Sequence, residues 1–190
     1  MSAPATAVVI GCSTGGLHAL STIFAALRPD LAVPVIAVCH RGQDDDGLLL
    51  VELLARHSRL PVCEAEERQP ARPGIVHLAP SGYHLLLEAD GTFMLSTDVR
   101  VRYVRPAVDV LFQTAADVHR QGLLAAVLTG ANDDGADGLL AVRRRGGWAL
   151  VQDPDEAEAP QMPQAALRRA GADAVLNLAG IARTINERCP

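Results

Sequence analysis

Short apolar segments alternate with segments of helical periodicity along most of the chain. The apolar runs predict strands at Ala7–Ile10, Pro34–Cys39, Val62–Ala65, Leu123–Thr129, Trp148–Val151 and Ala174–Leu178. Apolar residues spaced as on one face of a helix follow the first strand at Leu17, Leu20, Ile23, Phe24 and Leu27. Further helices are predicted at Leu48–Arg56, Gly138–Arg145 and Gln164–Ala170. Because helices separate strands that are apolar throughout, we expect a parallel sheet covered on both faces.

One stretch interrupts this alternation. Ile75–Leu78 and Tyr83–Leu87 flank an Ala-Pro-Ser-Gly turn, and Thr92–Ser96 follows Ala-Asp-Gly. Runs joined by glycine-containing turns predict antiparallel hairpins, inserted into the main sheet or added at its edge. Pro106 then predicts the first turn of another helix, where proline is tolerated. The predicted fold class is α/β, doubly wound, with a mostly parallel sheet and an antiparallel hairpin insertion.

The composition fits a single domain that spans residues 1–190. Of the 190 residues, 49% are hydrophobic, and the chain contains no internal repeat and no linker. The net charge is −5 without a long basic run, so nucleic acid is not expected as a partner. No apolar run approaches the roughly 18 residues that span a bilayer, and no secretion signal opens the chain. We therefore expect a cytoplasmic protein without membrane insertion.

The cysteines have neither the spacing of a metal site nor histidines at zinc-finger intervals. They are Cys12, Cys39, Cys63 and Cys189. Cysteines in or beside apolar runs are typical of small buried side chains in a reducing compartment.

Polar side chains follow three of the predicted strands at the point where each strand ends. Ser13 lies in a Gly-x-Ser-x-Gly turn after the first strand, and His40 follows the second. Asp133 and Asp134 lie in the polar segment after Leu123–Leu128. The carboxyl ends of parallel strands meet at one edge of a sheet, where ligands and catalytic groups collect. The sequence thus predicts a hydroxyl, an imidazole and a carboxylate at one edge, the parts of a Ser-His-Asp hydrolase.

Alternatives remain for each of these groups. A glycine turn before a helix can also bind an anion at the helix N-terminus. Spacing does not separate Asp133 from Asp134, and His84 in the hairpin region is a rival to His40. The order Ser, His, Asp along the chain also differs from the Ser, Asp, His order of α/β-hydrolases, which argues against a lipase-type fold.

Several blocks of the sequence resemble the chemotaxis protein-glutamate methylesterases, the CheB family. In chain order these blocks are Gly11-Cys12-Ser13-Thr14-Gly15-Gly16, His40, Leu78-Ala79-Pro80 with His84, Arg105–Phe112, Leu128-Thr129-Gly130 with Asp134-Gly135-Ala136, and Gln161-Met162-Pro163. The resemblance runs from about residue 7 to residue 178.

The resemblance implies a three-layer α/β/α domain that hydrolyses glutamyl methyl esters on chemoreceptors and deamidates their glutamines. It implies Ser13 as nucleophile, His40 as general base and Asp134 as the carboxylate. Backbone N–H groups at Ala131 and Thr14 are candidates for the oxyanion hole. No metal and no organic cofactor is required. The expected partners are the cytoplasmic signalling domain of a methylated receptor and a separate regulatory protein.

The chain also departs from the family pattern. Nothing precedes the first predicted strand, so we expect the catalytic domain alone, as a stand-alone esterase or a fragment, without the receiver domain of many members. After His40 the chain has an acidic stretch, Asp44-Asp45-Asp46, which would repel an acidic substrate. Ala131 stands where the family usually has methionine. These departures leave two further hypotheses: a regulatory or binding module with little or no catalysis, and an esterase or deamidase for another protein.

Overall fold

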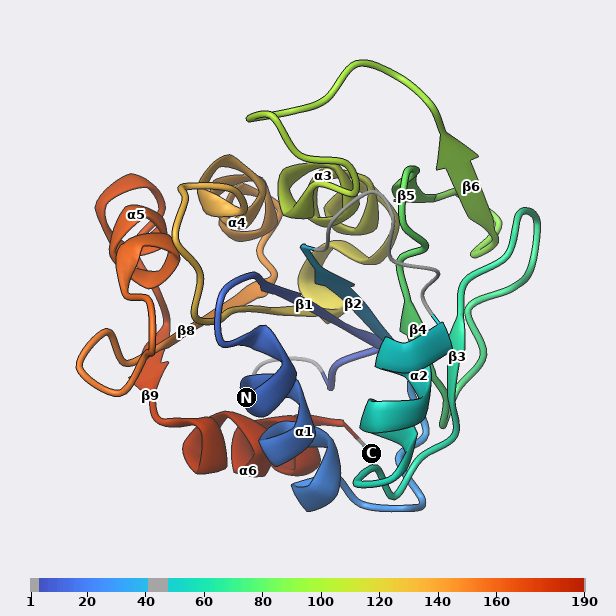
Figure 1. The fold of residues 1–190 in the computed structure, drawn as a ribbon, viewed down its shortest axis with the longest axis horizontal. Coiled ribbons are helices and arrows are strands. Elements are labelled where there is room, and N and C mark those ends of the chain that lie inside the picture. The colour runs from blue at the N-terminus through green and yellow to red at the C-terminus, as the bar shows by residue number, and fades with distance from the viewer. Residues whose placement is uncertain (1–3, 41–47, 190) are drawn as a thin grey trace.

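The computed structural model describes residues 4–40 and 48–189, and a seven-stranded parallel sheet forms its centre (Figure 1). The strand order is β3-β4-β2-β1-β7-β8-β9, and every pairing is parallel. The strands are β1 (Ala7–Cys12), β2 (Val35–Cys39), β3 (Val62–Glu64), β4 (Val76–Leu78), β7 (Leu123–Val127), β8 (Trp148–Gln152) and β9 (Ala174–Leu176). The parallel sheet that the apolar runs predict is confirmed.

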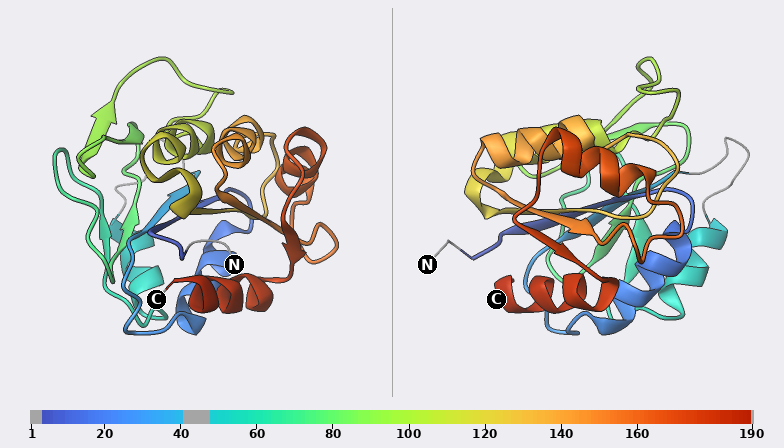
Figure 2. Two further views of the ribbon diagram at one scale, coloured as in Figure 1. Left: turned by 180° about the vertical axis from the view of Figure 1, so that it is seen from behind. Right: turned by 90° about the vertical axis from the view of Figure 1, so that its left-hand side faces the viewer.

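Helices cover both faces of this sheet (Figures 1 and 2). One face carries α3 (Val108–His119), α4 (Ala136–Arg144) and α5 (Gln161–Arg169), and the other carries α1 (Gly16–Ala26), α2 (Leu48–Ala55) and α6 (Leu178–Arg188). A short 3₁₀ turn, Arg120–Gly122, connects α3 to β7. No helix in the described part of the chain has the length and apolar content needed to cross a bilayer.

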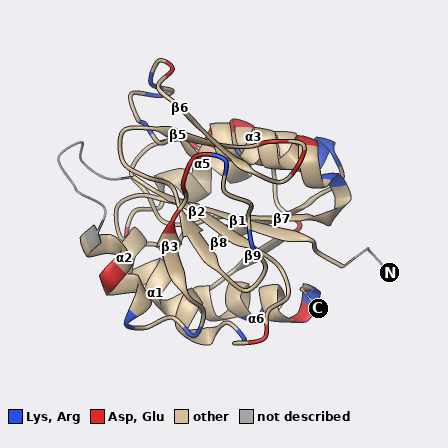
Figure 3. Ribbon diagram, turned by 90° about the vertical axis from the view of Figure 1, so that its right-hand side faces the viewer, with Lys and Arg blue, Asp and Glu red and all other residues tan. Residues whose placement is uncertain are grey.

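The core has one layer on each face of the sheet because side chains alternate along each strand. In β1, Val8 and Ile10 pack under α1 and α6, whereas Ala7 and Val9 pack under α3 and α4. The central strands β1, β2, β7 and β8 carry no charged residue, and the charges lie mainly on the outer helices and loops (Figure 3). A sheet covered on both faces requires such apolar strands.

The antiparallel hairpin consists of β5 (His84–Leu87) and β6 (Phe93–Ser96). The predicted hairpin insertion is confirmed, but the assignment of Ile75–Leu78 to it is wrong. Residues Val76–Leu78 form β4, which lies between β2 and β3 in the parallel sheet and is buried throughout. A three-residue strand beside glycine and proline has too few positions to show which sheet it belongs to.

The C-terminal helix α6 was not predicted, and its start shortens the predicted strand Ala174–Leu178. Asn177 is the N-cap, because its side chain accepts a hydrogen bond from Gly180 N–H at 2.8 Å. Helix α5 begins at Gln161, three residues before the predicted start at Gln164. Pro163 fits there because N–H groups in a first turn have no acceptor within the helix.

Gly11 allows β1 and α3 to approach each other closely, because it has no side chain. A Cβ atom at position 11 would lie 2.2 Å from Val108 Cγ1. Both residues are buried, so we expect Gly11→Ala to lower the free energy of unfolding by about 1–3 kcal/mol through overpacking.

Denaturant unfolding of a double-mutant cycle with Val108→Ala checks this prediction. Removing the valine methyl groups should relieve the clash. The double variant should therefore lose clearly less stability than the sum of the two single variants. Additive losses would contradict the close-contact explanation.

Candidate active site

Ser13 directly follows β1 at the carboxyl edge of the sheet. Its N–H donates to Thr129 O at 2.9 Å, which ties the turn to the end of β7. Gly15 then turns the chain into α1 with φ of 78°, a conformation that favours glycine. This turn leaves the Ser13 side chain half-buried at the edge, as predicted for a residue that follows the first strand.

His40 directly follows the neighbouring strand β2. Its N–H donates to Cys12 O at 3.0 Å, which fixes its backbone beside the residue before Ser13. Its side chain is only 8% exposed, and its Nε2 lies 2.8 Å from Asp134 Oδ2. The structure therefore brings His40 and Asp134 into contact although 94 positions separate them in the sequence.

The Asp134 carboxylate is fully buried and accepts hydrogen bonds on both oxygens. Oδ2 accepts from Val108 N–H at 2.6 Å, and Oδ1 accepts from Asp109 N–H at 3.0 Å and Gly135 N–H at 2.9 Å. Two of these donors belong to the first turn of α3, where N–H groups have no acceptor within the helix. A negative charge at a helix N-terminus is also stabilised by the helix dipole.

These contacts fix the tautomer of a neutral His40. A carboxylate only accepts hydrogen bonds, so Nε2 carries the hydrogen that points at Asp134. The lone pair is then on Nδ1, which lies 3.3 Å from Asn132 Nδ2. The imidazole therefore presents Nδ1 as its basic nitrogen.

The structure places Asp133 and His84 away from this contact. Asp133 is 59% exposed and forms an ion pair with Arg102. His84 is buried in β5, where its Nε2 donates to Val99 O at 3.1 Å and its Nδ1 accepts from Ala107 N–H at 3.2 Å. Both ring nitrogens of His84 thus bond to the backbone, which gives this side chain a structural role.

Ser13 and His40 open into the same pocket, of about 460 Å³. The other residues that line it are Gly15, Gly16, Leu17, His18, Cys39, Leu50 and Glu158. Within residues 4–40 and 48–189, no group of three or more His, Cys, Asp or Glu side chains could hold a metal ion. The arrangement therefore offers a hydroxyl and a carboxylate-bound imidazole to one small molecule or side chain.

Comparisons with known proteins give the family of this chain. The sequence pattern of the family described as CheB methylesterase matches residues 8–185. The chain belongs to this family. A putative protein-glutamate methylesterase/protein-glutamine glutaminase of Leptospira interrogans is 43% identical over 176 residues, which cover 93% of this chain and 91% of that protein. The crystal structure of the Thermotoga maritima CheB methylesterase catalytic domain has a TM-score of 0.92 and 33% identity, and the match covers 96% of this chain and 98% of that one.

Other members of the CheB methylesterase family are longer. The protein-glutamate methylesterase/protein-glutamine glutaminase of Symbiobacterium thermophilum is 37% identical over 182 residues, which cover 96% of this chain and 50% of that protein. The chain thus spans about half the length of several curated relatives that it matches.

The predicted oxyanion-hole residues, Thr14 and Ala131, are both exposed. The N–H groups of Ser13 and Gly130 already donate, to Thr129 O and Ala159 O, each at 2.9 Å. In the part of the chain that the structure describes, the N–H groups of Thr14 and Ala131 have no such acceptor. The predicted acidic stretch Asp44-Asp45-Asp46 lies outside the described residues.

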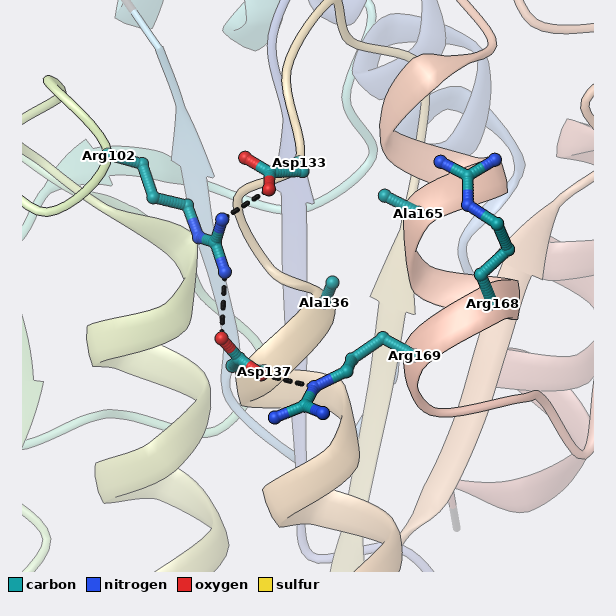
Figure 4. Close-up of a pocket in the computed structure, with 7 residues that line it drawn as sticks. All are labelled: Arg102, Asp133, Ala136, Asp137, Ala165, Arg168 and Arg169. Atoms are coloured by element: carbon teal, nitrogen blue, oxygen red, sulfur yellow. Dashed lines mark hydrogen bonds and ion pairs between the residues drawn. The ribbon is translucent and has the colours of Figure 1, made fainter.

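Sequence reasoning missed Arg102, whose guanidinium links several carboxylates (Figure 4). Its guanidinium pairs with Asp109 at 3.1 Å, with Asp137 at 2.7 Å and with Asp133. Asp137 also binds Arg169 Nε at 2.6 Å, and both residues line a pocket of about 410 Å³. Two residues of this network were named from the sequence, Asp133 as a candidate carboxylate and Asp109 inside the Arg-Pro-Ala-Val-Asp block.

Burial raises the pKa of Asp109, and the nearby charge of Asp134 raises it further, although Gly138 N–H and Arg102 act in the opposite direction. The pKa of this carboxyl is then higher in the folded than in the unfolded protein, so its protonated form favours folding. This contribution to the free energy of unfolding is complete when the pH lies below the pKa of the unfolded state. That contribution disappears as the pH rises through the folded pKa.

We therefore expect the stability of wild type relative to Asp109→Asn to fall as the pH rises from about 4. Unfolding in denaturant at a series of pH values measures this difference. A difference that stays constant across the acid range would contradict the prediction.

Proposed function

We propose that this chain hydrolyses glutamyl methyl esters on a methylated chemoreceptor-like protein, with Ser13, His40 and Asp134 as its catalytic residues. The observation that carries the proposal is the contact of 2.8 Å between His40 Nε2 and buried Asp134, beside a serine that opens into the same pocket. The names of the relatives, which combine methylesterase and glutaminase, support the same substrate class and add glutamine deamidation.

The proposed reaction is acyl transfer in two halves. His40 Nδ1 accepts the Ser13 proton while Ser13 Oγ attacks the ester carbonyl carbon. Asp134 holds the tautomer and stabilises the imidazolium that forms. The imidazolium then protonates the departing methoxide, so methanol leaves and a glutamyl ester of Ser13 remains. His40 then takes a proton from water as the water oxygen attacks the acyl carbon. The bond to Ser13 Oγ breaks, the imidazolium returns the proton to Ser13, and the glutamate side chain is released.

The tetrahedral intermediates carry an oxyanion that needs hydrogen-bond donors. Within residues 4–40 and 48–189 the N–H groups of Thr14 and Ala131 have no backbone acceptor, which supports their assignment to this role. A backbone donor does not depend on the side chain, so alanine in place of methionine at position 131 keeps it. Loss of one such donor typically costs about 3 kcal/mol of barrier.

The partner in this proposal is the signalling domain of a receptor in the cytoplasm, with a separate regulatory protein controlling the reaction. Cys12, Cys63 and Cys189 form no disulfide in the part of the chain that the structure describes, which supports a reducing compartment. The chain retains a buried, hydrogen-bonded carboxylate at His40, an arrangement that a pure binding module does not need.

Methanol release from a methylated receptor signalling domain tests the proposal. The wild-type chain should release methanol in proportion to the methyl groups present, and the unmethylated domain should release none. Ammonia release from receptor glutamines tests the deamidase half in the same reaction. Absence of methanol above the uncatalysed rate, with correctly folded protein, would reject the proposed activity.

A further inference from the structure

Asn132 contacts both His40 and the backbone of Asp134, so its amide has one defined orientation. Its Oδ1 accepts from Asp134 N–H at 3.0 Å, which closes a turn within the loop. A flipped amide would place NH₂ against that N–H group. Nδ2 is therefore the atom that lies 3.3 Å from His40 Nδ1.

The Asn132 amide donates to the same lone pair that the proposed reaction uses. With the hydrogen of His40 on Nε2, the ring has a single acceptor, the Nδ1 lone pair. In this structure that lone pair faces Asn132 Nδ2. The Ser13 hydroxyl needs it in order to transfer its proton, so Asn132 and Ser13 are alternative partners of one nitrogen.

We propose that Asn132 is a positioning residue that occupies His40 Nδ1 in the resting enzyme and must release it before Ser13 can react. This inference rests on the proposed function, because it assumes that Ser13 transfers its proton to His40. An amide donor facing Nδ1 stabilises the neutral ring in the tautomer that Asp134 selects. Once Nδ1 has taken the Ser13 proton, its N–H would point at the amide NH₂, so the amide must move away. Asn132 therefore keeps the base in the correct tautomer but limits the reactivity of the serine.

Two substitutions change the contact of residue 132 with His40 but keep its hydrogen bond to Asp134 N–H. Asn132→Ser keeps a side-chain oxygen for Asp134 N–H but is too short to reach His40. Asn132→Asp also keeps that acceptor, but it places an oxygen instead of NH₂ against Nδ1. The ring then holds a hydrogen on both nitrogens and has no lone pair for Ser13.

The rate of Ser13 labelling by a fluorophosphonate reads out these changes. We expect Asn132→Ser to label about three- to tenfold faster than wild type, because the variant no longer has to break one neutral hydrogen bond to His40 Nδ1. We expect Asn132→Asp to label roughly ten- to hundredfold more slowly, because a charge-assisted hydrogen bond holds the extra proton. A purely structural role of Asn132 would not produce changes of opposite sign. Asp133→Asn, which alters the adjacent exposed residue, should label at the wild-type rate.

Nitrogen-15 NMR of the His40 ring gives a readout that does not depend on labelling. Nδ1 should give the signal of an unprotonated nitrogen in wild type and Asn132→Ser, and of a protonated nitrogen in Asn132→Asp. If wild type labels at Ser13 but Asn132→Ser labels no faster, this inference is wrong and the proposed function stands. If wild type does not label at Ser13 at all, the proposed function fails and the inference with it.

Discussion

Replacing Ser13 by alanine should abolish methanol release while the fold stays intact. The substitution removes only the hydroxyl that we propose as the nucleophile, and no other described residue that lines the pocket is a serine. In serine hydrolases the loss of the nucleophilic serine lowers kcat by about 10⁶-fold, and the remaining acceleration comes from binding and the oxyanion hole. The measurement is methanol release from a methylated receptor domain.

The matched control for this variant is Ser21→Ala. Ser21 lies in α1, the helix that follows the Ser13 turn, but it does not line the pocket of Ser13 and His40. The control should retain wild-type activity, and both variants should unfold at nearly the wild-type denaturant concentration. Near wild-type activity of Ser13→Ala would show that Ser13 is not the nucleophile.

Replacing Asp134 by asparagine should lower kcat on the order of 10⁴-fold, the second largest effect that we expect. The carboxylate accepts four hydrogens, from three backbone N–H groups and from His40 Nε2. An amide has one oxygen, so its NH₂ must face some of these donors. If the oxygen stays with Asp109 and Gly135, the NH₂ meets Val108 N–H and donates to His40 Nε2.

That donation reverses the tautomer of His40 and moves its hydrogen to Nδ1, which then cannot accept the Ser13 proton. The variant should also lose about 1–3 kcal/mol of stability, because buried N–H groups remain unsatisfied. The control is Asp133→Asn, the same change at the adjacent exposed residue, which should leave kcat within a few-fold of wild type. Equal losses in the two variants would contradict the assignment of the carboxylate to Asp134.

The parallel sheet could be predicted because its strands are apolar runs between helical segments. The errors concern the sheet to which the short strand β4 belongs and the boundary between β9 and α6. Strand β4 has three residues beside a turn, so its parallel pairing with β2 and β3 depends on contacts far apart in the sequence. Helix α6 directly follows β9, and only the Asn177 cap marks the boundary.

The positions of Ser13 and His40 at one edge could also be predicted, because each residue directly follows a strand. Spacing could not separate Asp133 from Asp134, since adjacent residues in a loop have no periodicity that distinguishes them. The structure separates them through the first turn of α3, whose N–H groups bind Asp134 across 25 and 26 positions of sequence. The contacts of Arg102 and Asn132 depend on loop conformations that no local pattern encodes.

The central claim is that Ser13 is a nucleophile activated by the His40–Asp134 pair. Mass spectrometry of the chain after reaction with a fluorophosphonate tests it most directly, with wild type and His40→Gln compared at equal times. We expect one adduct, on the peptide that contains Ser13, and a loss of most of that adduct in His40→Gln. An adduct on another residue, or equal labelling of Ser13 in both proteins, would contradict it.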